Sequence, residues 1–461
     1  MITITNIMKF WPFKKKINHA ERQAIALAKS AVNHKRYSRF LHILGPGLVT
    51  GAADDDPSGI ATYSQVGAAH GHGLLWAFPL MYPLLLAVQE SCARIGAITG
   101  KGLAANLKEH YSKPMLYTAV ALVVIANTIN IGSDIGAMAA TMQLFVDIPF
   151  ELLAIGFAIG VAMLEVGVPY RIYAKLLKWL AIALLAYPVT AFVIGQPWGD
   201  IFKATFATVP KLDFATIYIF VGILGTTISP YLFFWDTSEV VEEEIKKHNV
   251  TKIGKDPVAT KHFLHRLRID NFTGMTLASV TAWFIVIVCA SVLFSNGITS
   301  INSASDAAKA LEPLVSGFPN AGLLAKIIFS IGIIGLGLLA VPVLAGSASY
   351  AISESLGWRE GLWRKFHRAI GFYLVIIIAT LIGLSINFVG IDPIKALIFT
   401  AVVNGVAAVP LLFMIARIGN NREIMGEYKN TLWSNIGIWG AFIIMAIAAA
   451  VLFYAMGTGQ A

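Results

Sequence analysis

Stretches of about 20 mainly apolar residues recur along almost the whole chain, a pattern that predicts an all-α protein crossing a membrane many times. No long polar insertion separates them, so we expect a single membrane domain over 41–461, preceded by a cytoplasmic N-terminal arm over 1–40 with a surface helix near 20–32. The eleven predicted transmembrane segments lie at about 41–69, 73–98, 114–144, 149–166, 170–195, 214–243, 270–296, 321–350, 369–389, 394–416 and 432–456.

Two of these segments are interrupted by polar residues next to a proline. Segment one carries Asp54, Asp55 and Asp56 directly before Pro57, and segment six has hydroxyl-bearing residues before Pro230. Proline removes a backbone donor and disfavours helix at the preceding residue, so each segment is predicted to consist of two half-helices around an unwound joint. A carboxylate at mid-membrane depth costs roughly 2.5–3.5 kcal/mol, so the three acids should face a cavity or an ion. An interfacial loop with solvated acids is the simpler alternative.

Segments one and six are equivalent if a first set of five helices, about 41–195, is repeated with inverted topology by a second set, about 214–416. The segment at 432–456 is then an extra eleventh helix. Paired interrupted helices at matching positions of two halves are typical of transporters that hold their substrate near the membrane midplane. Two unrelated proline kinks would produce the same local pattern.

The distribution of charge agrees with this segment count. The chain is 57% hydrophobic and only 13% charged, with a net charge of +9. With the N-terminus in the cytoplasm, the Lys and Arg residues left on the outer side are Lys203, Lys211, Lys309, Lys326 and Lys395. This asymmetry is what the positive-inside rule predicts. The basic excess therefore reflects topology in a lipid bilayer, and nucleic acid is not expected as a partner.

The residues at the two breaks favour a hard cation. Unwound backbone exposes carbonyl oxygens, and Thr226, Thr227 and Ser229 add hydroxyl oxygens to the aspartates. Oxygen ligands suit Mg²⁺, Ca²⁺ or Mn²⁺, and small residues such as Ser58 and Gly59 leave room for the waters that Mg²⁺ retains. Cys92 and Cys289 lie within apolar runs, so neither a disulfide framework nor a resident metal cofactor is expected.

Over about residues 40–430 the chain resembles the NRAMP family of divalent-metal transporters. The family's first-helix motif Asp-Pro-Gly-Asn corresponds to Asp56–Gly59, and its sixth-helix motif Ala-x-x-Met-Pro-His corresponds to Thr226–Tyr231. Further similarities are Gly45-Pro-Gly47, Glu354-Ser-Leu-Gly-Trp358 and the stretch 424–430. The resemblance implies a leucine-transporter-like fold, a bacterial-type plasma membrane, no enzymatic activity, and a C-terminus outside. We expect a monomer.

The resemblance also implies roles for particular residues. Asp56 is the essential metal ligand and the Thr226 carbonyl is another, while Gly59 and Ser229 stand where the family has a ligand asparagine and a ligand methionine. Loss of the thioether should admit harder, more hydrated ions. Asp55, Ser58 and Thr227 complete the expected site.

Proton coupling is not expected from this pattern. Tyr231 replaces the family's histidine after the proline, and Asp134 matches its proton-pathway aspartate, but Ala137 stands where a glutamate is expected. The chain is most similar to the NRAMP-related magnesium transporters, which implies import of Mg²⁺, and also of Mn²⁺, by alternating access. The alternatives are a proton-coupled Mn²⁺/Fe²⁺ importer, a sodium-coupled solute carrier, an intramembrane aspartyl enzyme and a channel.

Several polar residues allow two interpretations. Asp54 and Asp55 either face the pocket or bond neighbouring helix ends. Asp236 is either a vestibule acid that attracts cations or a solvated or paired side chain, and Asn404 either faces the cavity or bonds another helix. The acidic run 239–244 is predicted to be a solvated face, and Glu90 with Arg94 an i,i+4 ion pair.

Overall fold

The computed structural model describes residues 50–51, 53–168, 184–207, 213–246 and 261–458, all of which belong to one unit, Pro46–Ala461. Every secondary-structure element in these ranges is helical. The arm at 1–40 and most of predicted segment five lie outside the described residues. The longer helices are α4 (Ala77–Thr99), α6 (Lys113–Met142), α7 (Phe150–Gly167), α13 (Lys261–Val292), α15 (Ala321–Leu356), α16 (Ile370–Ile386), α17 (Pro393–Asn420) and α19 (Leu432–Gly457).

Within the described part, seven spans are long and apolar enough to cross a membrane, one of them joining two helices over Phe214–Ile245. Most observed helix ends lie within a few residues of the predicted segments. The exceptions are α13, which begins at Lys261 rather than 270, and α15, which continues to Leu356 rather than 350. Both helices extend past their apolar cores into polar sequence, because helical hydrogen bonding does not depend on the hydropathy used to predict the segments.

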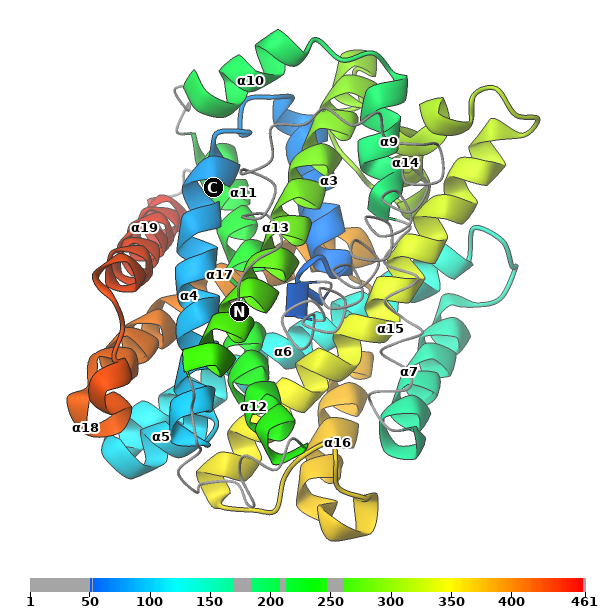
Figure 1. Cartoon of the computed structure of the whole chain (residues 1–461). Coiled ribbons are helices and arrows are strands. Elements are labelled where there is room, and N and C mark those ends of the chain that lie inside the picture. The colour runs from blue at the N-terminus through cyan, green and yellow to red at the C-terminus, as the bar shows by residue number, and fades with distance from the viewer. Residues whose placement is uncertain (1–49, 52, 169–183, 208–212, 247–260, 459–461) are drawn as a thin grey trace, which may run out of the picture. The chain divides into compact units, whose positions relative to one another are not determined.

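Short helices that the hydropathy pattern does not predict lie near the ends of the long ones. In Figure 1, α10 and α14 lie at one end of the bundle, and α5 and α18 lie at the other. These short α-helices are α5 (Leu103–His110), α10 (Trp198–Ala207), α14 (Ala304–Ala308) and α18 (Arg422–Met425), whereas the short helix α9 (Ala186–Val193) lies within predicted segment five. Short 3₁₀ turns are η3 (Phe294–Asn296), η4 (Lys309–Val315), η5 (Phe366–Arg368) and η6 (Gly426–Tyr428).

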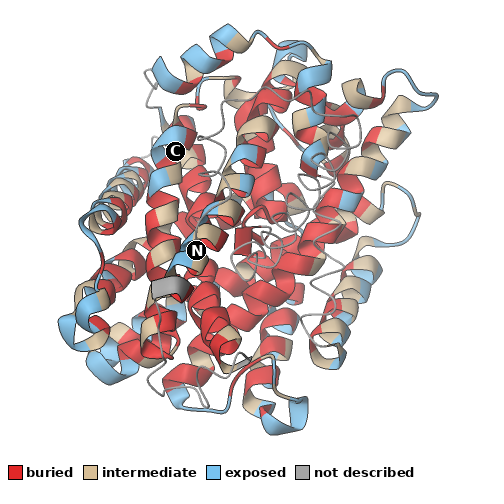
Figure 2. Cartoon of the chain, viewed as in Figure 1, coloured by how far each residue is buried: buried red, intermediate tan, exposed pale blue. Residues whose placement is uncertain are grey.

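Helix α3 (Pro57–His70) begins at the proline of the first interruption, directly after two non-helical residues, Asp55 and Asp56. Helix α11 (Phe214–Thr227) and helix α12 (Pro230–Lys246) are separated by Ile228 and Ser229, which are not helical. Both interruptions lie in the buried interior of the bundle (Figure 2).

The helices around these interruptions cross at very short range. An added Cβ at Gly225 of α11 would lie 2.0 Å from the Ala401 carbonyl oxygen of α17. An added Cβ at Gly405 of α17 would lie 2.5 Å from the Val221 carbonyl oxygen of α11. Small residues that allow such backbone approach are the usual basis of helix packing in membranes, where apolar burial supplies little driving force.

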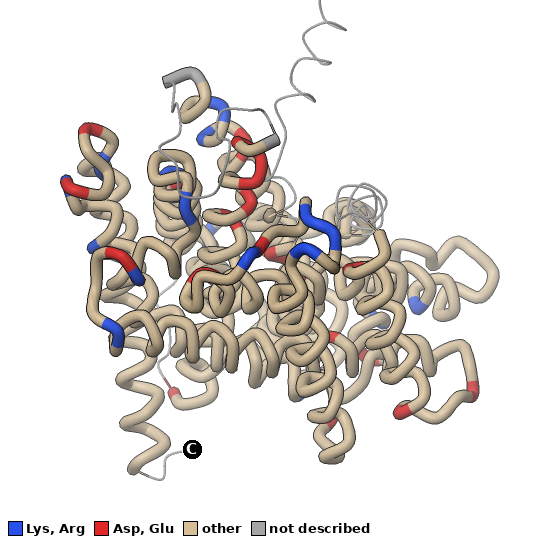
Figure 3. The backbone as a smooth tube through the Cα atoms, turned by 90° about the horizontal axis from the view of Figure 1, so that it is seen from below, with Lys and Arg blue, Asp and Glu red and all other residues tan. Residues whose placement is uncertain are grey.

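Charged residues lie mostly at helix ends and in loops, while the bodies of the helices are largely uncharged (Figure 3). The prediction of a solvated acidic face after segment six is wrong. Glu242 is 2% exposed and Glu244 is fully buried. Glu242 accepts hydrogen bonds from the Tyr350 hydroxyl and from the Leu362 amide (2.7 Å), so tertiary contacts with α15 and the following loop bury this end of α12.

The glycine crossing generates a stability prediction. Gly225→Ala should destabilise the protein by about 1–3 kcal/mol, because the added methyl group overlaps the α17 backbone, which has no flexible side chain to move aside. Gly156→Ala in α7 is the matched control, since nothing lies within 4 Å of its added Cβ and alanine favours helix by about 0.5–1 kcal/mol. Thermal unfolding in detergent measures both. Equal melting temperatures for the two variants would contradict the close crossing.

Candidate metal site

The first interruption places the Asp56 carboxylate at the N-terminus of α3. Asp56 is the N-cap residue, and its Oδ1 accepts hydrogen bonds from the Gly59 amide (2.8 Å) and the Ser58 hydroxyl (2.6 Å). Pro57 occupies the first helical position, where its missing N–H costs nothing. Capping fixes the carboxylate, and the positive end of the helix dipole stabilises its negative charge. The local sequence therefore builds this half of the site.

Asn130 of α6 completes the hydrogen bonding of Asp56 and joins it to a second acid. Its Nδ2 donates to Asp56 Oδ2 (3.0 Å) and to Asp134 Oδ2 (3.1 Å), while its Oδ1 accepts from Asn404 Nδ2 (3.1 Å). The sequence interpretation missed Asn130. The available signal was its position four residues before Asp134, on the same face of one helix.

Counting lone pairs indicates where a cation can bind Asp56. A carboxylate oxygen accepts about two hydrogen bonds. Oδ1 is filled by Ser58 and Gly59, whereas Oδ2 accepts only from Asn130 among the described residues. One direction on Oδ2 is therefore available to an incoming ion.

The second interruption is closed by its own hydroxyl groups. The Ser229 hydroxyl donates to the carbonyl oxygens of Gly225 (2.9 Å) and Thr226 (2.8 Å), which the end of α11 leaves without helical partners. The Thr227 hydroxyl donates to the Ile223 carbonyl (2.7 Å) and lies 2.9 Å from the Tyr63 hydroxyl of α3. Thr227 thus links α11 to α3.

The two interruptions lie against each other. An added Cβ at Gly59 would lie 3.1 Å from Thr226 Oγ1, so Gly59 is what allows the start of α3 to pack on the end of α11. The Tyr231 hydroxyl donates to the Ala53 carbonyl (2.8 Å) and ties α12 to the residues before the first interruption. Gly59 can offer a cation only its backbone.

Several buried oxygens around the interruptions have no hydrogen-bond partner within the described structure. Asp54, Asp55 and Asp56 are at most 3% exposed. Buried polar atoms are normally satisfied, so such a group of oxygens needs an explanation, and cation binding supplies one. The unpartnered oxygens are Asp54 Oδ1, Asp55 Oδ1, Asp134 Oδ1, Thr226 Oγ1 and Asn404 Oδ1. No three His, Cys, Asp or Glu side chains in the described ranges converge on one point as a prebuilt metal cage.

The structure separates the candidate pathway residues into two groups. Asp134 and Asn404 are joined to Asp56 through Asn130, as described above. Asp236 lies further along α12, is fully buried, and accepts a hydrogen bond from Asn271 of α13 (3.2 Å). Asp236 is therefore paired and not solvated, and its role as a vestibule acid stays a prediction.

A model of one protein family matches the chain over residues 47–455, that of the natural resistance-associated macrophage protein-like (Nramp) proteins. The chain belongs to the Nramp family.

Relatives of this Nramp chain are named for metal transport and not for an enzymatic reaction. The divalent metal cation transporter MntH of Klebsiella pneumoniae (strain 342) is 25% identical over 89% of this chain and 92% of that protein. The divalent metal cation transporter MntH 1 of Pseudomonas aeruginosa is 24% identical over 94% of this chain and 95% of that protein.

Solved structures share the fold. A manganese transporter of Eremococcus coleocola, 17% identical, superposes with a TM-score of 0.69 over 91% of this chain and 87% of that one. The transporter MhsT, solved with L-phenylalanine, is 13% identical and superposes with a TM-score of 0.55 over 89% and 98% of the two chains. The Nramp chain therefore has the fold of leucine-transporter-like proteins.

Two histidines lie at the C-terminal end of α3 in this Nramp chain. His70 is the last residue of α3 and His72 lies in the turn that follows. Burial lowers the pKa of the His72 imidazole, an effect that the nearby Asp200 opposes. Burial thus favours the neutral imidazole of His72.

The contacts of Asn130 generate a prediction about metal binding. Asn130→Ala should weaken binding by about tenfold or more, because two buried carboxylates lose the donor that positions them. Asn127→Ala is the matched control, since Asn127 lies on the same helix and donates only to the Leu344 carbonyl (2.9 Å). Titration calorimetry with Mn²⁺ on purified protein measures both affinities. If the two alanine variants bind equally well, Asn130 does not organise the site.

Proposed function

We propose that this chain is a secondary transporter that imports divalent cations, most favourably Mg²⁺ and also Mn²⁺, by alternating access. The ion rests where the interruption before α3 meets the one between α11 and α12. Asp56, the Thr226 carbonyl and Ser229 are its central ligands, with Asp55, Ser58, Gly59 and Thr227 around them. The observation that carries the proposal is the set of buried, unpartnered oxygens beside Asp56.

The preference for Mg²⁺ rests on the donor atoms. The residues at the two interruptions offer carboxylate, hydroxyl and carbonyl oxygens and no sulfur. Hard oxygen donors suit Mg²⁺ and Mn²⁺, whereas a thioether would favour softer transition metals. Only a few ligands come from the protein, which agrees with the tendency of Mg²⁺ to retain several waters.

We further propose eleven transmembrane helices in a five-plus-five inverted repeat, with repeats over about 41–195 and 214–416 and an extra helix over 432–456. Interrupted helices at matching positions, with acids at the first joint and hydroxyl groups at the second, support this arrangement. The asymmetry of Lys and Arg supports a bacterial-type plasma membrane with the N-terminal arm, 1–40, in the cytoplasm and the C-terminus outside. The protein acts as a monomer and needs no cofactor.

We propose that transport is not coupled to protons, since Tyr231 is engaged with a backbone carbonyl and Ala137 cannot carry a proton. One observation favours a second candidate, a proton-coupled Mn²⁺/Fe²⁺ importer. Asp134 is joined to Asp56 through Asn130, and such a chain could pass charge between a metal ligand and a buried acid. The names of the MntH relatives are consistent with this candidate.

Uptake into proteoliposomes tests the proposal. Mg²⁺, Ca²⁺, Mn²⁺ and Cd²⁺ compete for entry while a dye records internal pH. We expect Mg²⁺ and Mn²⁺ to compete without acidification, and metal-driven acidification would select the proton-coupled candidate. Asp56→Ala should lower uptake at least about tenfold, because a charged ligand is lost. Glu165→Gln, which neutralises a buried acid of α7 that is 4% exposed, is the control that should transport normally.

The Ser229 hydroxyl, at the second interruption, generates a prediction about which ions are preferred. Ser229→Met should shift competition towards Cd²⁺ and Mn²⁺ and away from Mg²⁺ by about tenfold, because a soft thioether replaces a hard oxygen and fills space that waters occupy. Ser229→Ala controls for loss of the hydroxyl without gain of sulfur. The same competition assay measures this shift. If Ser229→Met leaves the order of preference among the ions unchanged, Ser229 is not a ligand of the metal.

A further inference from the structure

A second buried acid lies in α12, beyond the second interruption, and takes no part in the central site. Asp236 is six residues after Pro230, which is about 9 Å along a helix. It is fully buried, and its Oδ2 accepts a hydrogen bond from Asn271 Nδ2 (3.2 Å). Its Oδ1 is buried and has no hydrogen-bond partner among the described residues. A buried carboxylate in this condition is costly unless something compensates its charge.

Polar groups of α4 and α13 surround this acid. Asn271 Nδ2 also donates to the Gln89 carbonyl (3.3 Å), so one amide joins all three helices. The Gln89 side chain is fully buried, and both its amide atoms lack partners within the described structure. Asp270, the neighbour of Asn271, is 2% exposed. The surroundings of Asp236 are therefore polar and oxygen-rich, unlike an ordinary helix–helix contact in a membrane.

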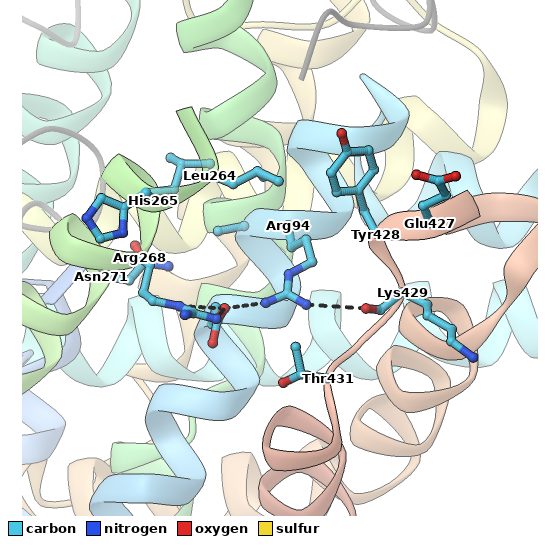
Figure 4. A pocket seen from close by; sticks show the side chains of 12 residues that line it. Arg94, Leu264, His265, Arg268, Asn271, Glu427, Tyr428, Lys429 and Thr431 are labelled. Carbon is cyan, nitrogen blue, oxygen red and sulfur yellow. Dashed lines mark hydrogen bonds and ion pairs between the residues drawn. The ribbon is translucent and has the colours of Figure 1, made fainter. Parts of the chain in front are cut away.

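Asn271 is also part of the wall of a surface pocket of about 320 Å³. Figure 4 shows this pocket between the inner end of α4, α13 and the segment that leads from η6 into α19. Asn271 thus touches Asp236 on one side and the pocket on the other.

We propose that Asp236, with Asn271 and the Gln89 carbonyl, forms a second cation-binding site, called the station below, between the central site and this pocket. The inference rests on the proposed function, and its ligand is the transported divalent cation on its way to the cytoplasm. A hydrated Mg²⁺ or Mn²⁺ needs only one or two carboxylates from the protein and keeps waters for its other positions. One carboxylate, one amide and one carbonyl satisfy that requirement.

The charges of the pocket disfavour a cation within the pocket itself, so the proposed second cation site lies at Asp236 and not in the pocket. Glu90 of α4 pairs with Arg94 and with Arg268 of α13 (2.6 Å), so two guanidinium groups face one carboxylate. This excess positive charge opposes a cation resting in the pocket itself. The Glu90–Arg268 pair also joins α4 to α13 across the pocket, and Figure 4 shows both arginines converging on the same acid.

Counting bound ions tests the station directly. Mn²⁺ is the probe, and electron paramagnetic resonance measures how many ions the purified full-length protein binds. We expect two ions in the parent, one in Asp56→Ala, one in Asp236→Asn and none in the double variant. Glu165→Gln, the matched control, should bind two, because its carboxylate lies on α7 and contacts neither site. A parent that binds one ion, removed by Asp56→Ala alone, overturns the station while leaving the proposed function intact.

Transport kinetics separate a station from a structural hydrogen bond. Asp236→Asn should slow Mg²⁺ uptake about tenfold with little change in the external concentration at half-maximal rate, because the central site is unaltered. Asp236→Glu retains the charge and should recover most of the rate, which keeps the test decisive if the asparagine variant folds poorly. Uptake by Asp236→Asn within twofold of the parent overturns the inference. Absence of metal uptake by the parent would instead overturn the proposed function, and the inference with it.

Discussion

The buried carboxylate of Asp56 is the constraint on which the rest of the structure depends. A charged group in the middle of a membrane protein survives only when hydrogen bonds and local dipoles replace its hydration. The chain meets this need with the Ser58 hydroxyl, the Gly59 amide and the Asn130 side chain. The first two come from the adjacent sequence, whereas the third comes from α6. The helix must be interrupted here because a continuous helix would leave no free N-terminus to cap.

Bringing the second interruption to this carboxylate requires helices that approach more closely than most side chains allow. Gly59 leaves space for Thr226, and Gly225 and Gly405 allow α11 and α17 to touch through their backbones. The close approach places oxygen-bearing residues of α11 beside the start of α3. Glycine at these positions is therefore as important to the candidate site as the acids are.

Acidic residues also hold the C-terminal part of α12 against its neighbours. Glu354 of α15 accepts hydrogen bonds from the Ser238 hydroxyl of α12 (2.9 Å) and the Ala105 amide of α5 (3.0 Å). Glu242 of α12 accepts from Tyr350 and Leu362, which lie in α15 and the loop after it. These charge-assisted bonds are polar and reversible, unlike packed apolar contacts. These bonds join α12 to α15, and α15 to α5, at this end of the bundle.

The sequence by itself determined the helical class, the approximate limits of most helices, the interruptions at Pro57 and Pro230, and the position of Asp56 at the first of them. These features are local, because hydropathy, proline geometry and helix capping act within a few residues. Only the tertiary structure decided that Asn130 joins Asp56 to Asp134, that Asp236 pairs with Asn271, and that the acids near the end of α12 are buried. Each of these depends on a partner from a distant helix, and nothing in a single stretch of sequence records which helix will lie beside it.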